Sequence, residues 1–330
     1  SGQGRSFDLT QFLMQLPVTP RARNELRATG HLELDTNNAA SGTLSLSSAA
    51  LDLTPLADLM SGAPPSPAVP SSMDPKPAGR PGEPIHLPIG HFVADAKLDA
   101  VFLREVAVSN WVARLDIQRD RMVVSPFSLT LNGAPVSASL DLNLGVEGYE
   151  YAVKGDLAAV PVAPLAKSFL SGDRVDLSGN ADASLDLKGA GVDGSALRKH
   201  LAGTAGFSAT NLNYRITALK SPLMKTLVRT LSTSLQIPGI EESPIRTLEA
   251  RIRAGQGVVN LSSARVSSDA FQATVRAEVR IADILTNSAI VLPVTVSLPR
   301  NGVFEELPTF LTFKGTVGAP RPDVDALALA

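Results

Sequence analysis

Apolar and polar residues alternate along much of the chain after residue 90. In 92–102 the even positions, among them Phe92, Ala94 and Leu98, are apolar, and charged residues stand between them. The same alternation recurs in 138–144, 175–187 and 271–281. Because side chains alternate across a β-strand, each run predicts a strand with one apolar and one polar face.

Other segments alternate less regularly but also predict strands, joined by short turns such as LNGAP at 131–135 and GQG at 255–257. They lie near 29–35, 42–48, 105–117, 121–131, 149–157, 203–213, 247–254, 257–266, 289–298 and 309–317. A parallel doubly wound sheet would need strands that are apolar on both faces. The pattern therefore predicts a mainly β fold: an elongated, antiparallel, twisted meander sheet curled into a groove or an open barrel.

Helical spacing is rare. Short helices are predicted at 7–16, 53–60, 162–170 and 195–201. A longer amphipathic helix is predicted at 217–235, where leucine recurs every four residues, with its start near Ser221 because Pro222 fits a first turn.

The apolar strand faces exceed what five helices can cover. They must cover one another, as in a sandwich or closed barrel, or line a groove filled by something apolar. Small Ala and Val side chains favour open space over interlocking aromatic rings. The side chains predicted to face an apolar guest are Phe92, Ala94, Leu98, Leu140, Leu142, Ala181, Ala183, Leu185, Phe271, Ala273, Val275, Ala277 and Val279.

A proline-rich segment interrupts this pattern at 61–88, which holds nine of the 24 prolines. Such a composition predicts an extended, disordered loop inserted between two strands. The expected organisation is therefore an N-terminal helix with strands of the groove in 1–60, the insertion in 61–88, and the main β-groove region in 89–330.

Composition narrows the function classes. With 44% apolar residues the chain of 330 residues should fold, and a net charge of −2 argues against general nucleic-acid binding. There is no cysteine, hence no disulfide or thiolate metal site. No apolar run is long enough to span a bilayer.

One motif looks like a nucleotide site: Gly189, Gly191 and Gly194 form G-x-G-x-x-G between a strand and a helix. The preceding strand is amphipathic, however, and no acid follows before Glu241 to bind a ribose. We therefore expect no nucleotide; the glycines should let a strand turn sharply into a short helix, with Ser195 as its N-cap.

No catalytic or metal-binding constellation is evident, so an enzyme and a cofactor are not expected. The four histidines, His31, His86, His91 and His200, lack zinc-binding spacing. The acid pairs Asp95/Asp99 and Asp182/Asp186 could face one another as glycosidase carboxylates do, but solvated polar faces explain them better.

Between Ser195 and Ile240 there are six basic residues and no acid. The simplest interpretation is a solvated polar face; the functional one is a basic rim that meets anionic head groups. The residues predicted for head-group contact are Arg198, Lys199, Lys220, Lys225 and Arg229.

Several stretches resemble the AsmA family of bacterial envelope proteins. LSGNADASLDLKGAG followed by ALRKHLAGTAGFSATN resembles its repeated order of strand, glycine turn, short helix and strand. RTLEARIRAGQGVVNLSSARVSSDAFQATVRAEVRIAD and the ending LTFKGTVGAPRPDVDALAL also resemble the family. The segments LSLSSAALDLTPLADLM and 91–142, on either side of the proline-rich insertion, resemble its upstream part, so the likeness covers 43–328.

The resemblance implies a periplasmic protein held in the inner membrane by an N-terminal helix, which we expect to precede residue 1. It implies a non-enzymatic protein whose apolar sheet face binds or conducts the acyl chains of lipids, with lipid or a membrane surface as partner. Such a protein would be linked to outer-membrane biogenesis or lipid homeostasis. The alternative is a non-conducting envelope scaffold that binds a protein partner, for which an exposed sheet edge would serve. A polysaccharide-degrading enzyme is a third possibility that the residues do not support.

Overall fold

The computed structural model describes residues 5–35, 39–62, 82–170, 177–215, 229–233, 240 and 242–329. It is mainly β, with 64% strand and 12% helix, which confirms the predicted fold class. The strands and short helices form two compact units: 1–160 with 167–169, and 161–166 with 170–330. The sequence pattern did not predict this division.

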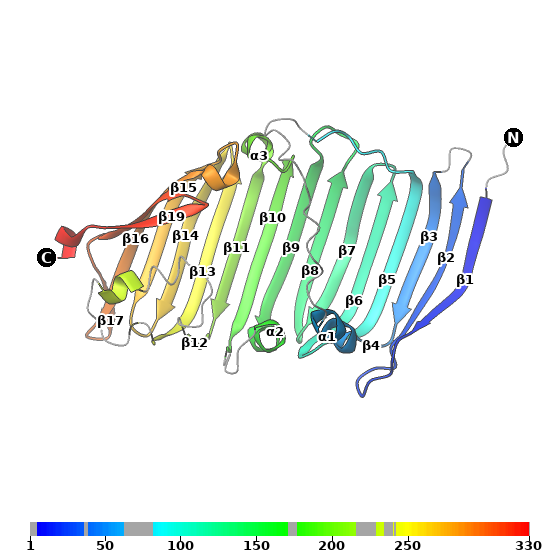
Figure 1. Cartoon of the computed structure of the whole chain (residues 1–330), viewed down its shortest axis with the longest axis horizontal. Helices are drawn as coiled ribbons and strands as arrows, with labels where there is room; N and C mark the ends of the chain where they lie inside the picture. The colour runs from blue at the N-terminus through cyan, green and yellow to red at the C-terminus, as the bar shows by residue number, and fades with distance from the viewer. Residues whose placement is uncertain are drawn as a thin grey trace. The chain divides into compact units, whose positions relative to one another are not determined.

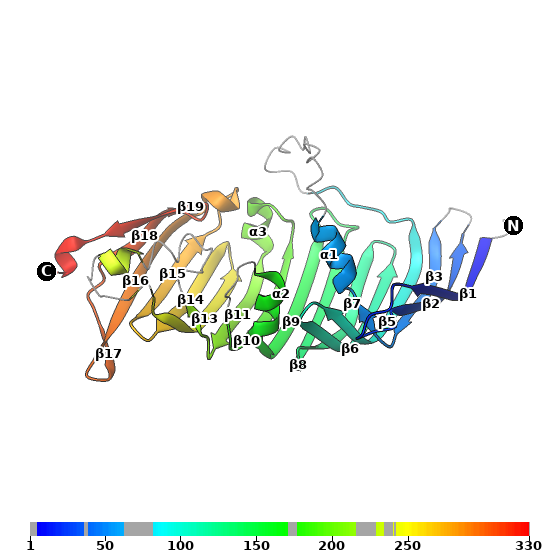
Figure 2. The ribbon, with the colours of Figure 1, turned by 60° about the horizontal axis from the view of Figure 1, so that its bottom comes forward.

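The first unit is built on one open sheet (Figure 1). Hydrogen-bonded neighbours follow the order β1, β2, β3, β5, β6, β7, β8 and β9, with β4 paired to β5; no pairing among the described residues joins β1 to β9. Figures 1 and 2 both show β1 as its outermost strand at the N-terminal side. The strands are β1 (Arg5–Gln15), β2 (Glu25–Leu34), β3 (Ala40–Ser48), β4 (Leu51–Asp52), β5 (Ile89–Leu103), β6 (Val106–Gln118), β7 (Arg121–Leu131), β8 (Ala134–Asn143) and β9 (Glu150–Pro161).

Most pairings in this sheet are antiparallel, as expected, but β3 and β4 run parallel to β5. The connection before β5 contains helix α1 (Thr54–Gly62) and a long following segment, and a crossover of that length permits parallel pairing. The other turns are tight. Asn132 and Gly133 both adopt positive φ, 50° and 88°, and join β7 to β8 as a two-residue hairpin.

The second unit is built on an open antiparallel sheet. β13 pairs with both β11 and the short β12, and β16 pairs with β17 at one end and β18 at the other. The strands are β10 (Asn180–Ala190), β11 (Ala202–Thr210), β12 (Tyr214–Arg215), β13 (Pro244–Gly255), β14 (Val258–Ser268), β15 (Gln272–Arg280), β16 (Ala289–Arg300), β17 (Val303–Glu306), β18 (Leu311–Thr316) and β19 (Ala319–Val324).

Short helical segments accompany these strands. Helix α2 (Val162–Phe169) follows β9, and helix α3 (Gly194–His200) connects β10 to β11. Two 3₁₀ turns, η2 (Leu285–Asn287) and η3 (Ala326–Leu329), occur nearer the C-terminus. The short helices predicted at 53–60, 162–170 and 195–201 are confirmed by α1, α2 and α3.

The helix predicted at 7–16 is wrong, because these residues form strand β1. A bulge between Leu9 and Phe12 shifts the register, so the apolar positions Phe7, Leu9, Phe12 and Met14 no longer alternate strictly. That spacing resembles a helical pattern. β19 was also missed, because Pro320 and Pro322 argue against a strand anywhere except at a sheet edge.

The proline-rich segment is more ordered than predicted at its two ends. Helix α1 extends to Gly62, and the backbone of Ile85 donates to the carbonyl of Leu144. Leu87 N donates to Asp120 Oδ1 at 2.9 Å, and His86 Nδ1 lies 2.7 Å from the other carboxylate oxygen. Residues 63–81 lie outside the described residues, as does most of the helix predicted at 217–235, of which 229–233 are helical.

Candidate functional site

One face of the first unit's sheet carries apolar side chains on every strand from β5 to β9. The register places Phe92 on β5 opposite Ile117 on β6, and Leu98 opposite Trp111. Residues that pair directly across strands point to the same face, so apolar rows can be followed across the sheet. Two such rows are Phe92, Ile117, Met122, Leu142 and Tyr151, and Ala94, Leu115, Val124, Leu140 and Val153.

These side chains retain contact with solvent. In the two rows, Ile117 is buried and the other nine are half-buried. Side chains pressed against a second layer of a fold are normally removed from water. The predicted guest-facing residues of the first unit, Phe92, Ala94, Leu98, Leu140 and Leu142, thus share one partly accessible face.

Trp111 lies on this apolar face and is the chain's single tryptophan. Its ring meets Phe127 edge to face, with the ring centroids 6.0 Å apart. The indole N–H has no hydrogen-bond acceptor among the described residues. The composition of the chain did not indicate where Trp111 lies. Its position on the apolar face follows from the strand register.

The second unit has a matching apolar face. Ala181, Ala183 and Leu185 on β10 pair with Ala209, Phe207 and Ala205 on β11. The row of Ala183 continues through Phe207, Ala250, Ala264 and Val275. Here the exposed fractions are 44% for Phe207 and 36% for Ile252, so part of this face is open to solvent.

At one end of the second sheet the same face is closed by a hydrophobic core. Phe271 is fully buried and Ala273 is 3% exposed, and they pack with Leu231 and Ile240 from the segment before β13. These two residues are therefore core residues, and the prediction that they face a guest is wrong. Further along β15, the strand that contains Ala273, the three predicted residues Val275, Ala277 and Val279 are half-buried.

The opposite face of the first sheet carries charged residues that pair with one another, beside buried apolar residues such as Val93 and Val101. Asp95 lies 3.3 Å from Arg114, and Asp141 forms a two-point ion pair with Arg121. The hydrogen bond from Arg121 lowers the pKa of Asp141. Paired surface charges of this kind explain the alternating acids better than a pair of glycosidase carboxylates.

Three of the four histidines lie beside the carboxylate of an aspartate. His31 lies 2.6 Å from Asp8 and His91 lies 3.2 Å from Asp116. The hydrogen bond from His86 lowers the pKa of Asp120. Within the described ranges no group of three or more residues could hold a metal ion.

The predicted head-group cations are only partly described. Arg198 pairs with Asp283 at 2.9 Å, and Lys199 and Arg229 are exposed. Lys220 and Lys225 lie outside the described residues. A basic rim formed by all five cations therefore stays a prediction.

The glycine motif has a packing role. A Cβ on Gly194 would clash with the backbone carbonyl oxygen of Ala282, so this position admits only glycine. The N-cap of α3 is Asp193, not Ser195 as predicted, and its carboxylate accepts from the backbone of Ala196 at 2.9 Å. Asp193 has extended backbone angles and so can point its side chain at the free N–H groups of the first turn.

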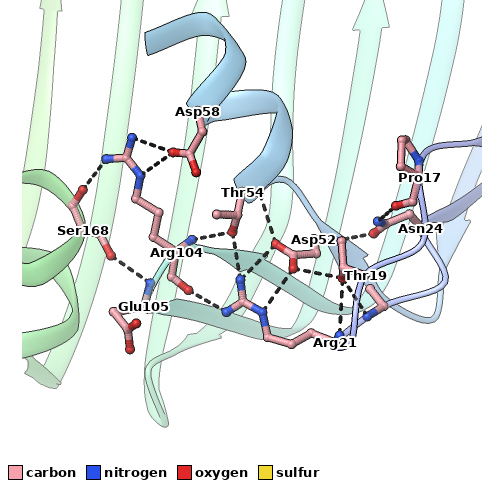
Figure 3. Close-up of polar contacts among 11 residues, drawn as sticks. Pro17, Thr19, Arg21, Asn24, Asp52, Thr54, Asp58, Arg104, Glu105 and Ser168 are labelled. Atoms are coloured by element: carbon pink, nitrogen blue, oxygen red, sulfur yellow. Dashed lines mark hydrogen bonds and ion pairs between the residues drawn. The ribbon is translucent and has the colours of Figure 1, made fainter. Parts of the chain in front are cut away.

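A polar clasp, which was not predicted from the sequence, joins four segments at one end of the first sheet (Figure 3). Arg21 pairs with Asp52 and donates to Thr54 Oγ1 at 2.8 Å. Arg104, in the β5–β6 turn, lies 3.0 Å from Asp58 on α1 and donates to the carbonyl of Ser168 on α2. Each of these polar groups has a partner within the clasp, so it holds the fold together and offers no free chemistry.

Comparison with known proteins agrees with this geometry. The family model for the AsmA family matches residues 89–263, which is more than half of the chain. The chain belongs to the AsmA family. The match runs from β5 in the first unit into β14 in the second, so in this AsmA-family chain it covers the apolar rows of β5–β9 and the part of the second apolar face on β10, β11 and β13.

Neither the curated proteins nor the solved structures contain a match to this AsmA-family chain. None of the helices in the described part of the chain has the length and hydrophobicity that crossing a bilayer requires.

Proposed function

We propose that the open apolar sheet face of this AsmA-family protein binds the acyl chains of a lipid. The observation that carries the proposal is the set of apolar rows across β5–β9, whose side chains are half-buried instead of packed into a core. Covering apolar surface is favourable by about 25 cal/mol per Å². A hydrocarbon chain that lies along these rows would cover the apolar surface and stabilise the complex without any polar partner.

Family membership supports the wider setting of the proposal. The AsmA resemblance implies a periplasmic protein anchored to the inner membrane, with a role in outer-membrane biogenesis or lipid homeostasis. Fractionation of cells that express the full-length gene tests the location. Recovery in the cytoplasmic fraction would contradict it.

Lipid extraction and native mass spectrometry of the purified protein test the binding. Leu140 lies on the apolar face, and its chain neighbour Ser139 points to the polar face opposite Lys154. Leu140→Asp should reduce bound lipid by about tenfold, because a carboxylate facing hydrocarbon loses its hydration. Ser139→Asp, which adds the same charge one residue away, should leave it unchanged.

Circular dichroism should show that both variants keep the strand signal of the parent protein. Equal lipid content in the parent and the two variants would contradict the proposal. Lipid-free protein that still supports function in cells would favour the scaffold alternative.

A further inference from the structure

A pocket of about 650 Å³ lies in the first unit, where the loop before β2, the start of β2, the end of β3 and the middle of β5 meet. Pockets of this volume can hold a small ligand. The described residues that line it include no aromatic ring and no apolar side chain larger than alanine. The pocket therefore suits a polar or charged ligand and not a hydrocarbon chain.

Three basic side chains and a hydroxyl group converge on this pocket from separate segments. Arg27 on β2, Ser47 on β3 and Lys97 on β5 are direct neighbours across the three strands. Residues paired in this way point to the same side of a sheet, so the two cations flank the hydroxyl group. Arg23, on the loop just before β2, lines the same pocket. All four side chains are exposed and can reach a ligand.

Charges elsewhere on this side of the sheet pair with one another, but those of the pocket do so incompletely. Asp95 on β5 is directly opposite Arg114 on β6 and forms an ion pair with it. The residues directly opposite Lys97 are a serine and a valine, which carry no charge. The side chains of Lys97 and Arg23 make no ion pair or hydrogen bond with any residue that the structure describes. Two cations are therefore available to a ligand.

Two carboxylates also line the pocket and oppose an anion. Glu25 lies 3.5 Å from Arg27, and a surface ion pair at this distance contributes little, so Arg27 can exchange it for a stronger acceptor. Asp99, two residues after Lys97, points to the same side of β5 and has no ion-pair partner among the described residues. Arg23, Arg27 and Lys97 still outnumber these two acids. An anion should therefore bind, with an affinity that Asp99 lowers.

The loop that carries Arg23 is fixed on both sides of this residue. Arg21 pairs with Asp52 within the clasp. Asn24 is 1% exposed, donates to the carbonyl of Pro17 and accepts from the backbone N–H of Asp52 (Figure 3). An anion that binds Arg23 does not have to order this loop, which reduces the entropy cost of binding.

We propose that this pocket binds a phosphate group, with Arg23, Arg27 and Lys97 as its cations. A guanidinium group donates two parallel hydrogen bonds to a phosphate, and the lysine ammonium group adds a point charge. The Ser47 hydroxyl can donate to a further oxygen. The phosphate can belong to a free phosphorylated molecule or to a lipid head group. The proposal is independent of acyl-chain binding, because the pocket shares no residue with the apolar rows.

Inorganic phosphate, titrated into the whole protein at constant ionic strength and followed by phosphorus NMR, is the first probe. Lys97→Gln and Arg23→Gln should each weaken its binding by roughly tenfold, because each removes a charge-assisted contact. Lys188→Gln is the matched control: Lys188 is an exposed lysine on β10 of the second unit, outside the pocket, and its loss should leave binding unchanged. Circular dichroism of the variants should match that of the parent protein.

Asp99→Asn makes a second test, which does not depend on losing a contact. Removal of a repelling surface charge should strengthen phosphate binding by roughly threefold. Weaker binding by Asp99→Asn would overturn the assignment to an anion, since the carboxylate would then be helping to hold the ligand.

Vesicles distinguish the two sources of the phosphate group. Co-sedimentation with vesicles of equal parts phosphatidic acid and phosphatidylcholine, absent with phosphatidylcholine alone and lost in Lys97→Gln and Arg23→Gln, would assign the pocket to a lipid head group. Binding of inorganic phosphate without such co-sedimentation would assign it to a free phosphorylated molecule. The proposal is overturned if neither probe binds, if Lys97→Gln and Arg23→Gln bind phosphate like the parent protein, or if Lys188→Gln weakens binding as much as they do.

Discussion

The guanidinium of Arg21 forms a two-point ion pair with Asp52, with Nη2 3.0 Å from Oδ1 and Nε 3.1 Å from Oδ2 (Figure 3). The side chain of Asp52 is only 5% exposed. The same guanidinium donates to the carbonyl of Arg104 at 2.6 Å and lies 5.1 Å from the centre of the Phe102 ring. One side chain thereby ties the β1–β2 loop to the end of β5.

Replacing Arg21 should destabilise the first unit. Arg21→Gln leaves the buried Asp52 carboxylate without its cation, and we expect the free energy of unfolding to fall by about 2 kcal/mol. Arg23→Gln is the matched control: Arg23 is exposed, and its loss should change the free energy by less than about 0.5 kcal/mol. Denaturant titration measures both, and equal stability of the two variants would contradict the role of the clasp.

The clasp also predicts that the stability of the first unit depends on pH. Burial by itself raises the pKa of Asp52, but hydrogen bonds from Thr54, Arg21 and Thr19 outweigh it, so the pKa lies below its ordinary value of 3.8. A carboxyl with a lowered folded pKa stabilises the fold above its unfolded pKa, and the contribution is lost as pH falls through the folded value. The stability difference between the parent protein and Asp52→Asn should therefore shrink below pH 3.8. If the stability difference between the two proteins stays constant at lower pH, the ionised carboxylate of Asp52 is not what stabilises the parent protein.

Gly194 should not tolerate a larger residue. Gly194→Ala places a methyl group against the backbone oxygen of Ala282, so we expect a loss of about 2 kcal/mol in the free energy of unfolding. Gly255→Ala is the control, because a Cβ there meets nothing within 4 Å. Thermal or urea unfolding compares the two variants. If Gly194→Ala leaves the free energy of unfolding unchanged, helix α3 can shift away from Ala282 without loss of stability.

Two phenylalanines of the second unit should respond very differently to truncation. Phe271 is fully buried in the core, and Phe271→Ala should cost about 3–5 kcal/mol. Phe207 is 44% exposed on the open part of the same sheet, and Phe207→Ala should cost about 1 kcal/mol in lipid-free protein. Similar losses in denaturant titrations would mean that the face around Phe207 is covered in solution.

The sequence predicted the long strands well because each of them has one apolar and one polar face. The segment at 92–102 has an apolar residue at every even position and lies within β5. The prediction failed where tertiary context changes the local pattern. The bulge in β1 disturbs the alternation after Leu9, and β19 tolerates proline because only one of its edges needs N–H groups.

The candidate surface was predicted only in part. Alternation shows which residues share a face, as for Leu140 and Leu142, but not what covers that face. Phe271 and Val279 read identically in the sequence, yet one is in the core and the other is half-buried. The long-range pairing of Arg21 with Asp52 left no sequence signal, since contacts across thirty residues depend on the fold.

Fluorescence of Trp111 reports on lipid binding at the proposed face, because Trp111 is the chain's single tryptophan and lies on that face. Phospholipids with brominated acyl chains should quench its emission, and the same lipids without bromine should not. Leu140→Asp should strongly reduce the quenching, and Ser139→Asp should preserve it. Identical emission with brominated and unbrominated lipid would contradict the binding of acyl chains at this face.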